Sequence, residues 1–233
     1  MDVRIYRQAG KGETMAILFT QYWDLMPGKS EEYSSFLTRE YIPTLQQLGM
    51  QLVGGYYVAV GEGPRIVAVA TVDESEYLRK TISSQEYQTI SNKLLEYVWK
   101  YSNKVYVPAG RIQEGPYRIQ TGVWKFNQYY NILQGKEEGH RKFVKEECLP
   151  GMEELKIPLT GGWRLVVGSG PRILAESTGR SIVEIAQAID SSLFRKLVRA
   201  LKTHYATDYS SRILAPTGRI EVPFLMSEMM KKF

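Results

Sequence analysis

The chain repeats itself, and this repeat constrains the fold more than any other feature of the sequence. The segment PGKSEEYSSFLTREYIPTLQQLGMQLVGGYYVAVGEGPRI begins at Pro27, and QGKEEGHRKFVKEECLPGMEELKIPLTGGWRLVVGSGPRI begins at Gln134, an offset of 107 residues. The two segments share glycines, prolines and apolar residues without a gap, which indicates one structural unit used twice. The matches include Gly28 and Gly135, Phe36 and Phe143, Pro43 and Pro150, Gly54 and Gly161, and Gly63 and Gly170.

The match extends beyond these segments in both directions. Phe19 and Tyr22 correspond to Phe126 and Tyr129 at the same offset. Downstream, Pro108 corresponds to Pro216 at an offset of 108, so the second copy carries one inserted residue. We therefore divide the chain into an N-terminal extension over residues 1–14, a first unit over 15–116, a second unit over 117–223 and a tail over 224–233.

Each unit contains the signals of four strands and two helical regions. In the first copy, apolar runs predict strands over 15–22, 52–60, 65–72 and 104–112. Gly61-Glu62-Gly63-Pro64 joins the two middle strands and is typical of a hairpin turn rather than a phosphate-binding loop. Helical spacing of apolar residues predicts one helix after Ser30 and another over 87–101. Pro43 predicts a kink or break near Glu40 in the first helix.

The order strand, helix, strand, strand, helix, strand is the ferredoxin-like βαββαβ arrangement, which has helices on one face of its sheet. The other sheet face is apolar and aromatic, so it must be covered. The second copy offers that cover. We therefore predict an α+β chain in which tandem ferredoxin-like βαββαβ units form an intrachain pseudo-dimeric eight-stranded α/β barrel.

This pattern resembles the dimeric α/β-barrel superfamily. The doubled βαββαβ order carries the resemblance, together with the Ser84-Gln85-Glu86-Tyr87 entry into the last helix of the first copy and the aromatic-rich first strand. Relatives include NIPSNAP-like proteins, EthD-like proteins, antibiotic-biosynthesis-type monooxygenases, muconolactone isomerases and chlorite dismutases. The resemblance implies the fold and a pocket, whereas the functions of these relatives are diverse.

Composition excludes several classes of function. The net charge of +5 comes from scattered basic residues, and their only dense cluster, Arg195 to Lys202, has the spacing of a solvated helix face, so we expect no nucleic-acid partner. The single cysteine, Cys148, rules out an internal disulfide and fits a cytoplasmic location. No apolar stretch is long enough to cross a bilayer. The spacing of histidine and cysteine marks no metal site.

Polar residues predicted to face the barrel interior are the first candidates for a site. On the first strand of each copy, Leu18, Thr20 and Tyr22 correspond to Lys125, Asn127 and Tyr129, and alternate residues of a barrel strand point inward. A lysine in an apolar pocket binds an acidic group or acts as a base. The alternative is a lysine that reaches solvent at the barrel mouth.

Two further charged residues stand in the middle of predicted strands of the second copy. Arg164 replaces Tyr57, and Glu176 replaces Val69. They are candidates for ligand binding, and the alternatives are an ion pair across the hairpin or an exposed edge. Because the two copies differ at these positions, we expect only one half to hold a functional pocket.

The two histidines allow a haem alternative. His140 occupies the position of Tyr33 on an apolar helix stripe, and His204 lies near the stripe of the last helix. Either is a candidate haem ligand of the chlorite dismutase-like type, although a boundary histidine without a ligand role is the alternative for both. The sequence requires no cofactor.

Three functions remain open. The first is a barrel that binds a small, partly apolar molecule, with cofactor-independent oxygenation or isomerisation as the activity that the resemblance implies. The second is a haem protein. The third is a structural or assembly protein whose barrel is filled by its own side chains. Apart from these functions, a homo-oligomer is an expected form of association.

Overall fold

The computed structural model describes residues 17–109 and 122–217, so the predicted N-terminal extension and C-terminal tail lie outside the described residues. The first half comprises β1 (Ile17–Leu25), α1 (Ser30–Phe36), η2 (Leu37–Tyr41), α2 (Ile42–Gln47), β2 (Gln51–Val60), β3 (Ile66–Val72), α3 (Ser75–Ile82), α4 (Gln85–Leu94) and β4 (Val98–Pro108). The second half comprises β5 (Trp124–Ile132), α5 (Glu137–Phe143), η3 (Val144–Cys148), α6 (Leu149–Glu154), β6 (Leu159–Val167), β7 (Ile173–Gly179), α7 (Ile182–Asp190), α8 (Ser192–His204) and β8 (Ala206–Pro216).

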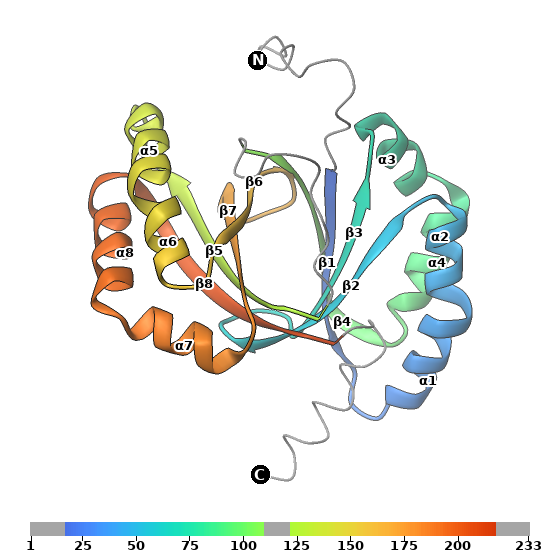
Figure 1. The fold of residues 1–233 in the computed structure, drawn as a ribbon. Helices are drawn as coiled ribbons and strands as arrows, with labels where there is room; N and C mark the ends of the chain where they lie inside the picture. The colour runs from blue at the N-terminus through green and yellow to red at the C-terminus, as the bar shows by residue number, and fades with distance from the viewer. Residues whose placement is uncertain (1–16, 110–121, 218–233) are drawn as a thin grey trace.

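The eight strands close into one antiparallel barrel in the order β1-β3-β2-β8-β5-β7-β6-β4. Each half contributes four adjacent strands, β4-β1-β3-β2 or β8-β5-β7-β6, which is the ferredoxin-like order. The halves join where β2 pairs with β8 and where β4 pairs with β6. The helices of each half cover the outside of its own sheet, on opposite sides of the molecule (Figure 1). The predicted pseudo-dimeric barrel is therefore confirmed, whereas the exact unit boundaries stay predictions.

Alternate strand residues face the barrel interior and the helices, as the sequence predicts. Leu18 and Tyr22 of β1 belong to the buried cluster inside the barrel, together with Tyr129 of β5. Phe19 of β1 and Phe126 of β5 instead pack under the helices of the first and second half. The molecule thus has three packed layers, one inside the barrel and one under each set of helices.

Local sequence explains where the helices bend and begin. Pro43 and Pro150 each lack an N–H, and each follows a five-residue π-helical turn, η2 or η3, that replaces regular α-helical bonding. This confirms the break predicted near Glu40. The hydroxyls of Ser84 and Ser191 accept backbone N–H bonds at the starts of α4 and α8, which fixes the entry of both helices.

Two predicted details of the helices are wrong. The helix expected over 87–101 ends at Leu94, and Val98 and Tyr101 lie in β4, because the chain turns at residues 95–97 and continues as a strand. The sequence reading also missed α3 and α7, the short helices that precede α4 and α8. Both predicted hairpins, β2–β3 and β6–β7, are present. No helix of the described ranges is long and apolar enough to span a bilayer.

Candidate ligand sites

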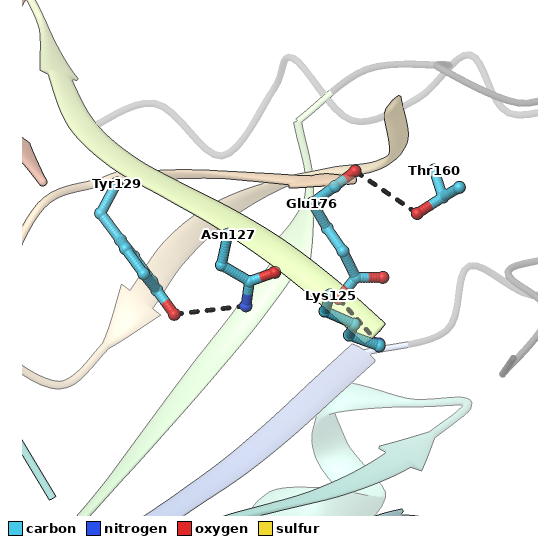
Figure 2. Close-up of polar contacts among 5 residues, drawn as sticks. All are labelled: Lys125, Asn127, Tyr129, Thr160 and Glu176. Carbon is cyan, nitrogen blue, oxygen red and sulfur yellow. Dashed lines mark hydrogen bonds and ion pairs between the residues drawn. The ribbon is translucent and has the colours of Figure 1, made fainter. Parts of the chain in front are cut away.

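A buried ion pair lies inside the barrel (Figure 2). Lys125 Nζ of β5 donates to Glu176 Oε2 of β7 at 2.9 Å, and the two side chains are only 2% and 5% exposed. The lysine also lies over the ring of Tyr56, 4.9 Å from its centroid. The expected alternative, a lysine reaching solvent, is therefore wrong. Because two charges lose hydration here, the pair is not by itself evidence of stability.

Other predicted interior residues join this layer. Asn127 Nδ2 donates to the Tyr129 hydroxyl at 3.3 Å, and both residues come from the inward face of β5 (Figure 2). Tyr22 of β1 is buried in the same cluster. The structure thus brings together Tyr22, Lys125, Asn127, Tyr129 and Glu176.

Arg164 does not join them. It lies on the exposed side of β6 and pairs in register with Ile173, whereas Glu176 pairs with Gly161. The ion pair expected between Arg164 and Glu176 is therefore wrong, because their side chains leave opposite faces of the sheet. His204 also lies apart, exposed at the end of α8 with its ring against Tyr205.

A cavity of about 610 Å³ lies outside the barrel, between the sheet of the second half and its helices α5, η3, α6 and α8. Most of its wall is apolar, formed by residues such as Leu159, Phe194, Leu197 and Leu201. Exposed charged side chains of α5 and η3, Glu137, Arg141 and Lys145, stand at its solvent side. The volume lies within the range of small-molecule sites, which are commonly apolar with a few placed polar groups.

The polar groups of this cavity come from one end of β5 and from the facing helix. Gln128 accepts a hydrogen bond from the Tyr209 hydroxyl through Oε1 at 2.9 Å, while its amide nitrogen has no protein partner in the described residues. The hydroxyl of Tyr130 lies 3.0 Å from His140 Nε2. Cys148 also lines the cavity. An amide N–H at the wall of an apolar cavity favours a ligand that accepts a hydrogen bond.

Burial sets the protonation states of these groups. It lowers the pKa of His140, so the imidazole is neutral at pH 7, and it raises the pKa of Tyr130, so the phenol keeps its proton. Burial, with Glu147 nearby, raises the pKa of the Cys148 thiol to about 12. The cavity therefore presents uncharged hydrogen-bonding groups and no thiolate nucleophile.

The equivalent space in the first half is filled. Tyr33, Tyr41 and Tyr87 are buried there, and their counterparts in the second half are His140, Cys148 and Phe194. The exchange of Tyr41 for Cys148 removes a whole aromatic ring, so the same backbone leaves a cavity. In the first half, Gln21 forms hydrogen bonds with three tyrosine hydroxyls. Its counterpart in the second half, Gln128, forms a hydrogen bond with one, that of Tyr209.

Sequence reasoning placed His140 on this helix stripe but missed Gln128, Tyr130 and Cys148, because it sought the site on the inward faces of the strands. The signal was present in the repeat. Positions occupied by tyrosine in the first copy hold smaller or less polar residues in the second, on the helices that pack against the sheet. The described part of the chain holds no group of three or more metal-ligating residues.

Comparisons with solved structures place this architecture among known folds. A haem-binding protein from Thermus thermophilus aligns with a TM-score of 0.57 and 10% identity, over 91% of this chain and 94% of that one. A chlorite dismutase variant from Candidatus Nitrospira defluvii aligns at 0.58 and 8% identity, over 90% and 94%. A candidate monooxygenase from Lactobacillus acidophilus aligns at 0.55 and 8% identity, over 86% and 93%.

The fold is therefore that of the dimeric α/β-barrel proteins, with both units in one chain. At such low identity the likeness shows the fold alone. No protein-family model matches the sequence. No curated protein matches it either.

Proposed function

We propose that the chain is a binding protein for a small, mostly apolar molecule, held between the sheet and helices of the second half. The observation that carries this proposal is the 610 Å³ cavity at a place where the first half packs the buried rings of Tyr33, Tyr41 and Tyr87. A repeat that needed only stability would keep the filled arrangement, since unfilled volume costs stability.

The polar groups indicate what the molecule must carry. A carbonyl or ether oxygen of the ligand accepts from the Gln128 amide, and a hydroxyl donates to or accepts from the His140 and Tyr130 pair. A neutral imidazole accepts a proton more readily than the amide or the phenol beside it, so His140 is the group of the cavity best suited to take a proton from a bound phenol or enol once its contact with Tyr130 is exchanged for the ligand. Among solved structures of this fold is an anthrone oxidase-like protein, which fits a substrate of that type.

Filling the cavity tests the proposal. The neutral fluorescent probe N-phenyl-1-naphthylamine is expected to bind the wild-type protein saturably with increased emission. The variant Cys148→Tyr, which copies Tyr41 of the first half, should lose this binding at least tenfold while remaining folded. Tyr41→Phe, which keeps the filled shape of the first half, is the control and should bind as the wild type does. Equal probe binding by Cys148→Tyr and the wild type contradicts the proposal.

Haem is the second candidate, because one solved structure of this fold is a haem-binding protein and His140 lines the cavity. The residues do not present a ready axial ligand, since the Tyr130 hydroxyl occupies the hydrogen-bonding position at Nε2. An absorbance scan after adding haemin decides between the candidates. A Soret band that disappears in His140→Ala, but not in His204→Ala, supports haem and overturns the preference for an apolar molecule. The cytoplasmic location and any homo-oligomer stay predictions.

A further inference from the structure

Two further cations, Lys104 and Arg212, occupy equivalent places inside the barrel. Lys104 of β4 pairs in register with Thr20, and Arg212 of β8 pairs with Asn127, the counterpart of Thr20. Both side chains point inward, since Tyr106 and Leu214, two residues further along each strand, belong to the interior cluster. Duplication has thus placed a positive charge at the same level on both sides of the barrel.

The two charges share their aromatic neighbours. Lys104 Nζ lies 5.3 Å from the ring centroid of Tyr22, and Arg212 Cζ lies 5.7 Å from the same ring. Arg212 also lies 5.4 Å from the ring of Tyr129. Tyr22 and Tyr129 are themselves equivalent, so the four side chains form one cluster, here called the Lys104–Arg212 site. Like charges held this close repel, and burial together with Arg212 lowers the pKa of Lys104.

Neither cation forms an ion pair with any residue in the described ranges. Lys125, in the same interior, has Glu176 at 2.9 Å. Charged groups that are partly withdrawn from water are seldom left without an opposite charge. The barrel interior of the described residues therefore carries two positive charges in excess.

Tyrosine hydroxyls supply hydrogen-bond donors at the same place. The Tyr106 hydroxyl is fully buried and makes no hydrogen bond within standard distance and angle. The groups that act on its pKa, after burial, are Tyr129, Tyr22 and Arg212, which places its oxygen among the residues of the site. The Tyr129 hydroxyl accepts from Asn127, and Tyr22 is among the groups that act on its pKa.

The two glycine-rich turns close over these cations. A side-chain Cβ on Gly63 would lie 2.6 Å from Arg212 Nη2, and one on Gly170 would lie 3.2 Å from Lys104 Nζ. Both glycines have positive φ, 99° and 119°, so the turn backbone packs directly against each cation. Each half thus covers the cation of the other half with its own Gly-x-Gly-Pro turn.

We propose that the Lys104–Arg212 site binds a doubly charged oxyanion of the phosphate or sulfate type, either free or as the end group of a small molecule. Two positive charges match such a dianion, and lysine, arginine and tyrosine hydroxyls are suited donors to its oxygens. Lys104 and Arg212 are half-buried, which leaves them reachable from solvent, while Tyr22, Tyr106 and Tyr129 form a buried floor. The site lies on the opposite face of the sheet from the helix–sheet cavity and does not depend on it.

Isothermal titration with sodium phosphate, at ionic strength held constant with sodium chloride, tests the site. One equivalent should bind saturably and raise the melting temperature. Lys104→Met and Arg212→Met should each weaken binding at least tenfold, and Tyr106→Phe a few-fold. Lys196→Met, which removes an exposed charge on α8, is the matched control and should bind phosphate as the wild type does.

Phosphate that stabilises the wild type no more than chloride does, or that binds Arg212→Met as tightly as the wild type, overturns the proposal. If the variants do not fold, the wild-type protein alone is tested by the broadening of the ³¹P resonance of phosphate. Broadening is expected when phosphate binds, and its absence also overturns the proposal. Phenyl phosphate distinguishes a free oxyanion from the end group of a small molecule. Tighter binding than phosphate identifies an ester end group, and equal or weaker binding identifies the free anion.

Discussion

The helix–sheet layers of the two halves share one backbone plan but differ in what fills them. In the first half, Gln21 donates to the hydroxyls of Tyr41 and Tyr101 at 2.8 Å each and accepts from Tyr41 at 3.0 Å. In the second half, Gln128 retains only the bond from Tyr209 among the described residues. The π-helical turns, the serine caps and the hairpins are the same in both. The features that the two halves share therefore specify the fold, whereas a few side chains that differ between the halves produce the cavity.

On the inner face of the barrel, the second half has the more polar side chains. Where the first half has Leu18 and Val69, the second has Lys125 and Glu176, so the second half is polar inside and hollow outside. The second copy holds the Lys125–Glu176 pair and the cavity, whereas the first copy has apolar or aromatic side chains at the corresponding positions. The comparison yields three predictions, ordered by the size of the expected effect.

The largest effect is expected from breaking the buried ion pair with a residue of the first half. Lys125→Leu removes the cation that lies 2.9 Å from the buried Glu176 carboxylate, which should cost about 3–5 kcal/mol of unfolding free energy. The double variant Lys125→Leu with Glu176→Val restores the apolar pair of the first half and should be near the wild type or more stable. Urea unfolding measures both. If the double variant is as unstable as the single one, the pair is not the reason for the loss.

A smaller effect is expected when the stability losses caused by replacing Gln21 and Gln128 are compared. Gln21→Leu leaves several buried tyrosine hydroxyls without a partner and should cost about 3 kcal/mol, because each unsatisfied buried group costs about 1–3 kcal/mol. Gln128→Leu removes one hydrogen bond beside a cavity and should cost only about 1 kcal/mol. The measurement is again urea unfolding of both variants. Equal losses would mean that the second half is as fully satisfied as the first.

The sequence could predict the fold because the signals that specify it are local and occur twice. Gly61 and Gly63, Pro43 and the alternating faces of β1 each have a counterpart, and each limits the backbone in a known way. The inward direction of Lys125, Asn127 and Tyr129 followed from that alternation and is correct. Register did not follow, so an ion pair of Arg164 with Glu176 and an exposed Arg164 both stayed open, since pairing depends on the bulge between Leu159 and Gly161.

The cavity could not be predicted from one copy alone. An apolar helix stripe beside an apolar strand face indicates a packed layer, and Phe143, Leu197 and Leu201 give that pattern whether or not the layer is full. The loss of side-chain volume between Tyr41 and Cys148, on the helices that pack against the sheet, is the largest of the differences that distinguish the two halves there. Whether a smaller side chain leaves a cavity depends on which residues surround it in the folded protein, and the sequence alone does not give those neighbours.

The smallest of the three effects concerns pH and the exchange of Tyr33 for His140. Burial holds the pKa of His140 in the folded protein below its usual value of 6.5. Above that value the imidazole is neutral in both states and the stability is complete. As the pH falls below 6.5, the unfolded chain takes up a proton that the folded chain does not, so stability falls by at most about 1.4 kcal/mol per pH unit until the folded pKa is reached.

His140→Tyr, which restores the residue of the first half, should remove this loss. The measurement is the difference between the two proteins in unfolding free energy at pH 7 and at pH 5, which cancels titrations common to both. The wild type should lose more stability than the variant over this interval, because only it contains the buried imidazole. A ligand that accepts a hydrogen bond from neutral His140 should steepen the wild-type profile further, since it stabilises the same uncharged state. An identical pH dependence in both proteins would mean that the imidazole is protonated within the folded layer, and the cavity would then hold a positive charge that selects an acidic ligand.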